Sequence, residues 1–332
     1  MRKNRILGAA AAIVATVVYA LPASAREFPL TPNQIAVGDI GEYTTKAKDT
    51  LLDVARDNDL GYTQLVMANR AINPWLPGDG KRVVLPNFYL LPDGPRRGIV
   101  LNLAEQRVFY FPPKGKTVET YPIGAGVQGW NTPIGLTRIV TKQVHPGWAP
   151  PPSIRRERPE LPAYMPPGPD NPMGDLAMGL AWRGFYLHGT NKPYGVGRNV
   201  SHGCIHFYPE DIERLFHEVS VGTPVRVINQ ETMTGWIDNR LYVAVFPTKD
   251  QVDEIDIEHP ITPIVPPDLM QRVRDAAGNR ADEVDWALVT RLGLERNGIP
   301  TAVTPSQVAA NSSNGSGGAS IIDRVLATFR AR

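Results

Sequence analysis

Apolar positions in the first third of the chain predict a small module with two helices between two strands. Residues 41–44 read as a short strand. From Leu51 onward apolar residues recur at helical spacing, directly behind an Asp-Thr pair suited to cap a helix. A second helical stretch ends at Asn69, and a Pro- and Gly-marked turn separates it from a strand at 82–86. We therefore expect a βααβ module over residues 40–86.

From residue 97 to 228 the pattern changes to short alternating runs, which predict a mainly β domain. Strands are expected at residues 99–103, 107–111, 121–124, 136–141, 182–187 and 225–228. The first two flank a tight turn and predict a hairpin. Pro209 to Glu218 predicts one amphipathic helix. Residues 146–172 are too rich in proline for regular structure, so we expect an irregular loop, either a lid over a cleft or a surface excursion.

The rest of the chain predicts a C-terminal subdomain over residues 229–310 and a tail over residues 311–332. Residues 241–246 read as a strand, and residues 268–296 read as two helices broken at Gly278. The tail begins with a linker of Ser, Gly and Asn that has no capacity to form a core, and it ends in a short amphipathic stretch. The extension is therefore expected to be α-rich.

Residues 1–25 have the layout of a secretory signal peptide. A basic start precedes an apolar run from Ile6 to Leu21, and the triplet Ala23-Ser24-Ala25 follows. The run is short and ends in a cleavage site, so we expect no transmembrane segment in the mature chain. The signal holds three of the 35 basic residues and none of the 33 acidic ones, so 32 remain against 33. This balance gives no indication of nucleic-acid binding.

Cys204 is the only cysteine, so the chain cannot form an intramolecular disulfide. A free thiol in an oxidising compartment is open to oxidation, and an inert core cysteine is the simplest alternative to a functional one. Three of the six histidines lie near it: His188, His202 and His206. A nearby imidazole is the usual means of lowering a thiol pKa, which favours a nucleophile.

The glycines of the same segment suit acyl chemistry. Gly189 and Gly203 let the backbone approach a reacting atom closely, and consecutive amides at His202, Gly203 and Cys204 can form an oxyanion hole. A metal site formed by the three histidines and the cysteine is a second interpretation, although Cys/His zinc sites usually have wider gaps between ligands. A purely structural cluster is disfavoured, because burying three imidazoles and a thiol is costly. We therefore expect nucleophilic catalysis without metal or cofactor.

The order of these residues resembles the signature of the L,D-transpeptidase (YkuD) catalytic domain. His188-Gly-Thr is followed sixteen residues after the histidine by the cysteine of Ser201-His202-Gly203-Cys204. Further matching motifs extend the resemblance over residues 97–228: Thr132-Pro133-Ile134-Gly135, Asp170 to Gly174 and Asn191 to Arg198. The module at 40–86 resembles LysM, which binds glycans that contain N-acetylglucosamine, although Lys48 stands where that family usually has Gly. A LysM module behind a secretory signal resembles the branch found in Gram-negative periplasms.

The resemblance implies a β-sandwich-like catalytic domain with a minor helix, and a two-step acyl transfer on peptidoglycan stem peptides. Cys204 would attack the carbonyl of the L-centre of meso-diaminopimelate that precedes the terminal D-Ala of a tetrapeptide stem, and D-Ala would leave. His188 would be the base, its second nitrogen held by the carbonyl of Gly189. The acceptor is the amine of another stem or the terminal lysine of an anchored outer-membrane protein.

Five further residues are expected to support the site or contact the substrate: Ser201, His206, Arg198, Tyr194 and Arg183. His206 stands two residues after the cysteine, where the family most often has Arg, and it is largely neutral near pH 7. Arg198 is expected to cover part of that guanidinium's role. Trp182 and Tyr186 are favoured as packing residues.

Other functions remain open on the sequence. Transfer of the acyl group to water would give an L,D-carboxypeptidase or an amidase that detaches anchored protein. A glycan-binding wall protein with a vestigial catalytic domain is an alternative of a different class. A papain-like peptidase is disfavoured because there the cysteine precedes the histidine, and sortases have a much wider spacing.

Overall fold

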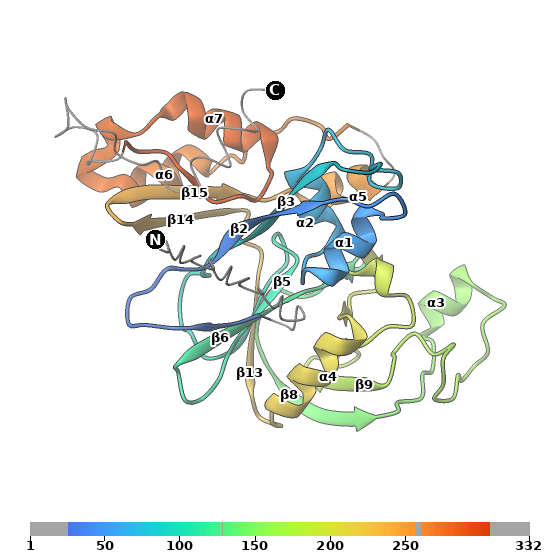
Figure 1. Ribbon diagram of the computed structural model, residues 1–332. Helices are drawn as coiled ribbons and strands as arrows, with labels where there is room; N and C mark the ends of the chain where they lie inside the picture. The colour runs from blue at the N-terminus through green and yellow to red at the C-terminus, as the bar shows by residue number, and fades with distance from the viewer. Residues whose placement is uncertain (1–25, 128, 257–259, 306–332) are drawn as a thin grey trace, which may run out of the picture.

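The computed structural model describes residues 26–127, 129–256 and 260–305. The predicted signal peptide (1–25) and the predicted tail (311–332) lie outside these residues. Within the described ranges, none of the helices is both long and apolar enough to cross a membrane. Figure 1 shows the N-terminal module and the C-terminal subdomain side by side, above a large sheet.

The N-terminal module has the predicted order strand, helix, helix, strand, over a slightly wider range. Its elements are β2 (Ala36–Thr44), α1 (Leu51–Asp57), α2 (Tyr62–Ala68) and β3 (Arg82–Leu90). Thr50 caps α1, since its hydroxyl accepts the Asp53 amide while the Asp53 carboxylate accepts the Thr50 amide. The helices bury Leu51, Val54 and Leu65 against β3. The LysM assignment of this module stays a prediction.

A nine-stranded sheet forms the centre of the molecule, and the expectation of mainly β structure is confirmed. Its order is β1-β6-β5-β4-β13-β8-β9-β10-β12. The bounds are β1 (Arg26–Pro29), β4 (Gly98–Asn102), β5 (Arg107–Phe111), β6 (Thr117–Pro122), β8 (Gly135–Val144), β9 (Leu176–Leu180), β10 (Tyr186–His188), β12 (Ile205–His206) and β13 (Pro224–Ile228). The predicted hairpin is β4–β5.

The sheet is curled, so that its last strand meets the chain just beyond β6. Gly124 and His206 exchange backbone hydrogen bonds of 2.9 and 3.0 Å. Helix α4 (Pro209–Glu218) has the predicted bounds, and it buries Ile212 and Leu215 in the core that the curled sheet encloses. Two short strands, β7 (Ala125–Gly126) and β11 (Asn199–Ser201), pair outside the large sheet.

Two local expectations are wrong. Residues 182–185 form a turn rather than the start of a strand: the Phe185 amide bonds to the Trp182 carbonyl, and Gly184 has φ +87°. The loop at 146–172 contains a short helix, α3 (Pro152–Glu157). Proline is tolerated there because the first helical residue has no intrahelical partner for an amide.

The C-terminal subdomain packs helices on a small sheet. Its elements are β14 (Thr232–Ile237), β15 (Arg240–Val245), α5 (Lys249–Asp256), α6 (Leu269–Ala277), a 3₁₀ helix (Gly278–Glu283), α7 (Trp286–Glu295) and β16 (Thr301–Ala302). The predicted break at Gly278 is confirmed, since α6 ends there with the glycine at φ +56°. Phe88 and Leu90 of the module share a core with Met233 and Tyr242, which joins the two parts.

The N-terminal module also docks on the segment between His188 and Cys204. The amides at the start of α2, Tyr62 and Thr63, donate to the carbonyls of Val196 and Gly197 at 3.2 and 3.1 Å. A Cβ atom at Gly197 would lie 2.1 Å from the Tyr62 nitrogen, and its φ is +82°. The close approach therefore requires glycine at this position.

Candidate active site

His188 lies at the end of β10, between β9 and β12. Leu187 points into the core, and the imidazole of His188 on the opposite face is 2% exposed. Its Nδ1 lies 2.7 Å from the carbonyl oxygen of Gly189, the partner expected from the sequence. Burial lowers the pKa of His188 to about 4, against the opposing effect of hydrogen bonds to the backbone of Gly189 and Met173. The imidazole is therefore neutral near pH 7, with Nδ1–H donating to Gly189.

Cys204 directly precedes β12, which runs parallel to β10. The register pairs His188 with His206 and Leu187 with Ile205, so Cys204 falls opposite Tyr186. Because side chains alternate along a strand, Cys204, His206 and His188 share one face. The nucleophile and the base thus lie diagonally across two adjacent strands.

The thiol of Cys204 is half-buried, and its Sγ lies 3.7 Å from the carbonyl oxygen of Gly184. Burial raises the pKa of the thiol, and a hydrogen bond with the backbone of Tyr186 only partly opposes this. The expectation that a neighbouring imidazole lowers this pKa is not met, because His188 is itself buried and neutral. The resting site thus holds a thiol and a neutral imidazole rather than an ion pair.

His206 packs beside the base. The two imidazole centroids lie 4.6 Å apart with the rings tilted by 56°. Burial and the neighbouring His188 lower the pKa of His206 well below its usual value. A permanently charged residue at this position would interact electrostatically with His188, whereas neutral His206 places no charge next to the base.

The turn before the nucleophile is held by its own side chains. The Ser201 hydroxyl donates to the Cys204 carbonyl at 2.6 Å and accepts the Gly203 amide at 3.0 Å. Gly203 has φ +100°, and a Cβ there would lie 2.7 Å from the Phe185 ring. Because the Gly203 amide is already engaged, its expected role in an oxyanion hole requires that bond to break.

The loop at 146–172 reaches the same turn through His202. Its Nε2 lies 2.9 Å from a carboxylate oxygen of Glu157, the last residue of α3. The His202 ring also packs on Trp130, with centroids 4.9 Å apart. This contact places the loop against the residues next to the nucleophile, which is the geometry that a lid would need.

The other predicted residues divide between two places. Arg183 is exposed and precedes Gly184, whose carbonyl contacts the thiol, so it lies beside the site. Arg198 turns away: its guanidinium stacks 4.0 Å from the Tyr62 ring centroid and pairs with Asp256 at 2.9 Å. Tyr194 likewise donates to Asp53 of α1 at 3.1 Å. These two side chains join the catalytic segment to neighbouring parts of the fold.

Sequence reasoning noted Thr132 only as part of a motif, and the structure gives it a definite contact. Its buried hydroxyl donates to the Gly203 carbonyl at 2.8 Å. The contact from Thr132 links two of the motifs that are separated in the sequence.

Among the residues that the structure describes, no three His, Cys, Asp or Glu side chains converge as a metal site would require.

Comparisons with known proteins agree with this arrangement. The family model of the YkuD L,D-transpeptidase catalytic domain matches residues 96–227. The probable L,D-transpeptidase YcfS of Escherichia coli K12 is 36% identical over 292 residues, which cover 84% of this chain and 90% of that protein. This chain belongs to the L,D-transpeptidase family.

Other members of the L,D-transpeptidase family match over different lengths. The probable L,D-transpeptidase ErfK/SrfK of Escherichia coli K12 is 43% identical over 51% of this chain and 56% of its own length. The probable L,D-transpeptidase YbiS of the same strain is 34% identical over 87% of this chain and 96% of its own. A crystal structure of an Enterococcus faecium L,D-transpeptidase mutant aligns with a TM-score of 0.32 and 22% identity, over 40% of this chain and 50% of that one.

The family model ends before the C-terminal subdomain, so α5 falls outside the L,D-transpeptidase domain. Asp256 of α5 nevertheless pairs with Arg198 inside that domain. The sequence carried no local signal for this contact, because the two residues are far apart in the chain and each sits in an unremarkable polar context.

Proposed function

We propose that this protein is a periplasmic L,D-transpeptidase that acts on the tetrapeptide stems of peptidoglycan through a thioester on Cys204. The observation that carries the proposal is the placement of the only cysteine and the buried neutral His188 on one face of adjacent strands. Membership of the family supports the same chemistry. Residues 1–25 support export to the periplasm through their signal-like sequence.

In the first step, the neutral His188 accepts the Cys204 proton as the sulfur attacks the carbonyl of the L-centre of diaminopimelate. The bond from Nδ1 to the Gly189 carbonyl keeps the ring oriented and stabilises the imidazolium that forms. The backbone amides of His202 and Cys204 stabilise the oxyanion, and the Gly203 amide joins them only when it leaves the Ser201 hydroxyl. The imidazolium then gives its proton to the leaving amine, so D-Ala departs and the thioester remains.

In the second step, an acceptor amine attacks the thioester. His188 takes a proton from that amine and returns one to the sulfur, which regenerates the thiol. The acceptor is the side-chain amine of a second stem, which gives a 3→3 cross-link, or a lysine of an outer-membrane protein. Transfer to water is the alternative outcome and would make the enzyme an L,D-carboxypeptidase.

Incubation with purified disaccharide-tetrapeptide, followed by chromatography and mass spectrometry, tests this function. We expect release of D-Ala together with a dimer cross-linked between two diaminopimelate residues. The Cys204→Ala variant should yield neither product. Tripeptide without dimer would move the assignment to a carboxypeptidase, and intact substrate with wild-type protein would contradict the catalytic proposal.

We further propose that the N-terminal module binds the glycan strands of peptidoglycan. The support is the order of its elements and the LysM-like sequence. Because the module is built into the fold through α2, its deletion would disturb the catalytic domain. Competition is therefore the better test: oligomers of N-acetylglucosamine should release the Cys204→Ala variant from isolated sacculi, whereas retention at all oligomer concentrations would count against glycan binding.

A further inference from the structure

Helix α5 lies against the segment that leads to the nucleophile, although it belongs to the C-terminal subdomain. Lys249, Asp253 and Asp256 are spaced by four and three residues, so they share one face of the helix. All three bond to residues within the range that the family model matches. The buried side chains Val252 and Ile255 fix the helix from the adjoining face.

Helix α5 holds the start of β11. The Asn199 side-chain amide donates to the Asp253 carboxylate at 2.8 Å and to the Lys249 carbonyl at 3.1 Å. Asp256 pairs with Arg198, the residue before Asn199, at 2.9 Å. β11 ends at Ser201, whose hydroxyl bonds to the Gly203 amide and the Cys204 carbonyl, so these contacts support the residue that anchors the nucleophile turn.

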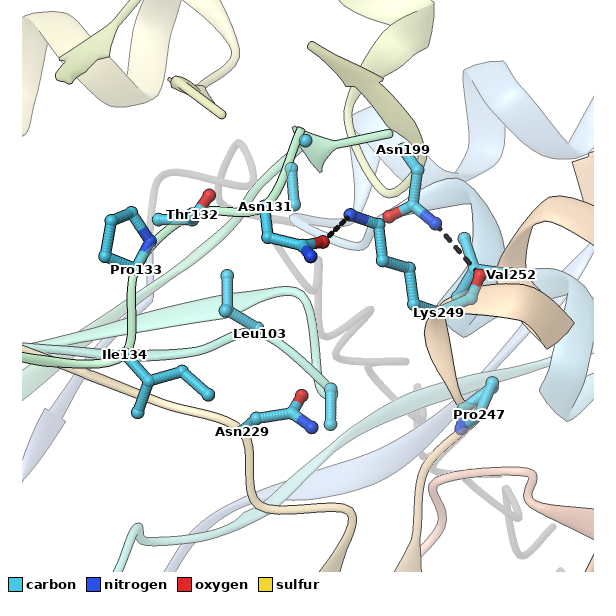
Figure 2. A pocket seen from close by; sticks show the side chains of 13 residues that line it. Leu103, Asn131, Thr132, Pro133, Ile134, Asn199, Asn229, Pro247, Lys249 and Val252 are labelled. Carbon is cyan, nitrogen blue, oxygen red and sulfur yellow. Dashed lines mark hydrogen bonds between the residues drawn. The ribbon is translucent and has the colours of Figure 1, made fainter. Parts of the chain in front are cut away.

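The first residue of α5 holds a second segment. The Lys249 ammonium donates to the Val127 carbonyl and to the Asn131 side-chain oxygen, each at 2.6 Å. Figure 2 shows the contact between Lys249 and Asn131 as a dashed line, with Asn199 beside Lys249 at the wall of a cavity of about 450 Å³. The Val127 amide in turn donates to the Ser201 carbonyl at 2.8 Å. Next to Asn131, Thr132 binds the Gly203 carbonyl.

The two supported segments therefore both bond to the turn that carries the nucleophile. One reaches the turn through Ser201 and the other through Thr132 and Val127. The turn itself contains a glycine at φ +100°, and because glycine also adopts many other conformations, the contacts around the turn have to select this one. Hydrogen bonds to charged groups are the stronger kind, and α5 supplies them at both segments.

We propose that α5 is a brace for the catalytic turn, in which Lys249 and Asp253 are positioning residues that keep Cys204 aligned with His188. The kinetic part of this inference rests on the proposed acyl-transfer function. A displacement of about 1 Å between reacting groups can lower a rate by about 100-fold, so loss of one brace contact should be visible in the chemical step. The brace also gives the C-terminal subdomain a role in catalysis without any contact with substrate.

The test compares three variants on the same helix. Asp253→Ala removes the acceptor for Asn199, whereas Asp253→Asn keeps an oxygen at the same place. Asp250→Ala changes an exposed acidic residue in the first turn and serves as the control. Each full-length variant is acylated by a carbapenem in single-turnover experiments, and backbone hydrogen exchange is followed over residues 198–204.

We expect Asp253→Ala to lower the limiting acylation rate about tenfold without changing the carbapenem concentration at half-saturation, and to speed exchange in residues 198–204. Asp253→Asn keeps the acceptor oxygen but loses its charge, so it should be slowed less than Asp253→Ala. Asp250→Ala should behave like wild type. Lys249→Met removes the other brace contact and should slow acylation in the same way. It replaces Asp253→Ala in the test if that variant proves unstable.

Wild-type rates and exchange in both Asp253→Ala and Lys249→Met would overturn the brace. Equal slowing in Asp253→Ala and Asp253→Asn would also overturn it, because the acceptor oxygen would then not matter. Hydrogen exchange does not depend on activity. If wild-type protein is not acylated, the proposed function fails, and exchange alone still decides whether α5 holds the turn.

Discussion

Mild acid should leave the acylation of Cys204 unchanged, well below the pH at which an ordinary histidine becomes charged. Burial lowers the pKa of His188 to about 4, from a usual value of 6.5. At pH 5.5 a histidine with a pKa of 6.5 would be about nine-tenths protonated, whereas His188 would be about 3% protonated. Because burial also raises the thiol pKa, Cys204 stays protonated over this range and adds no slope of its own.

The assay is the single-turnover acylation rate by a carbapenem between pH 5 and 8. We expect less than a twofold change between pH 7.5 and 5.5, and a fall only as the pH approaches 4. His188→Ala should lower the rate at pH 7 by about 10²- to 10⁴-fold, which is the usual range for loss of a general base. A tenfold fall between pH 7.5 and 5.5, with an apparent pKa near 6.5, would refute the buried neutral base.

Alkylation of the substrate-free enzyme by iodoacetamide separates the neutral pair from a thiolate–imidazolium pair, since only the thiolate reacts rapidly. The neutral pair predicts slow alkylation at pH 6 and a rate that still rises above pH 8. A rate that is already at its plateau at pH 6 would show a preformed ion pair and contradict the account.

Three other predictions follow from single contacts. Glu105 is buried and burial raises its pKa to about 7, so the neutral form that stabilises the fold is lost as the pH rises through 7. In urea titrations, Glu105→Gln should therefore raise the free energy of unfolding by about 2 kcal/mol at pH 8 and by little at pH 4.5. Equal effects at both pH values would argue against this. Gly203→Ala should lower the free energy of unfolding by about 1–3 kcal/mol and slow acylation, because the new methyl group meets the Phe185 ring. Gly184 also has a positive φ, but a Cβ atom there would meet no neighbour within 4 Å, so Gly184→Ala should have a milder effect. Equal effects of the two variants would exclude the clash with Phe185. Thr132→Val should cost about 1–2 kcal/mol in the same titrations and slow acylation, and an unchanged variant would show that its bond to Gly203 is dispensable.

Elements with a strong local pattern were predictable from the sequence. The amphipathic face of α4 and the break at Gly278 follow from residue spacing and from glycine chemistry, and both match the structure. The βααβ order of the module was predictable for the same reason. The errors fall where local signals compete: the proline-rich sequence hides α3, and the aromatic residues Trp182 and Phe185 flank a turn that Gly184 permits.

The candidate site was predictable as far as one contiguous motif carries it. His188, Cys204 and the Gly189 carbonyl come from a single segment, so their proximity follows from the sequence. Arg198 shows where this reasoning stops, because its partners come from two distant parts of the chain. The direction of the thiol pKa was also out of reach, since it depends on how deeply the fold buries both groups.

The most direct test of the central claim is intact-mass measurement after incubation with a carbapenem. Wild-type protein should gain the mass of one inhibitor molecule, located on Cys204 by peptide mapping, and Cys204→Ala should gain none. Wild-type protein that stays unmodified under conditions where a known L,D-transpeptidase is acylated, or an adduct that persists in Cys204→Ala, would contradict it.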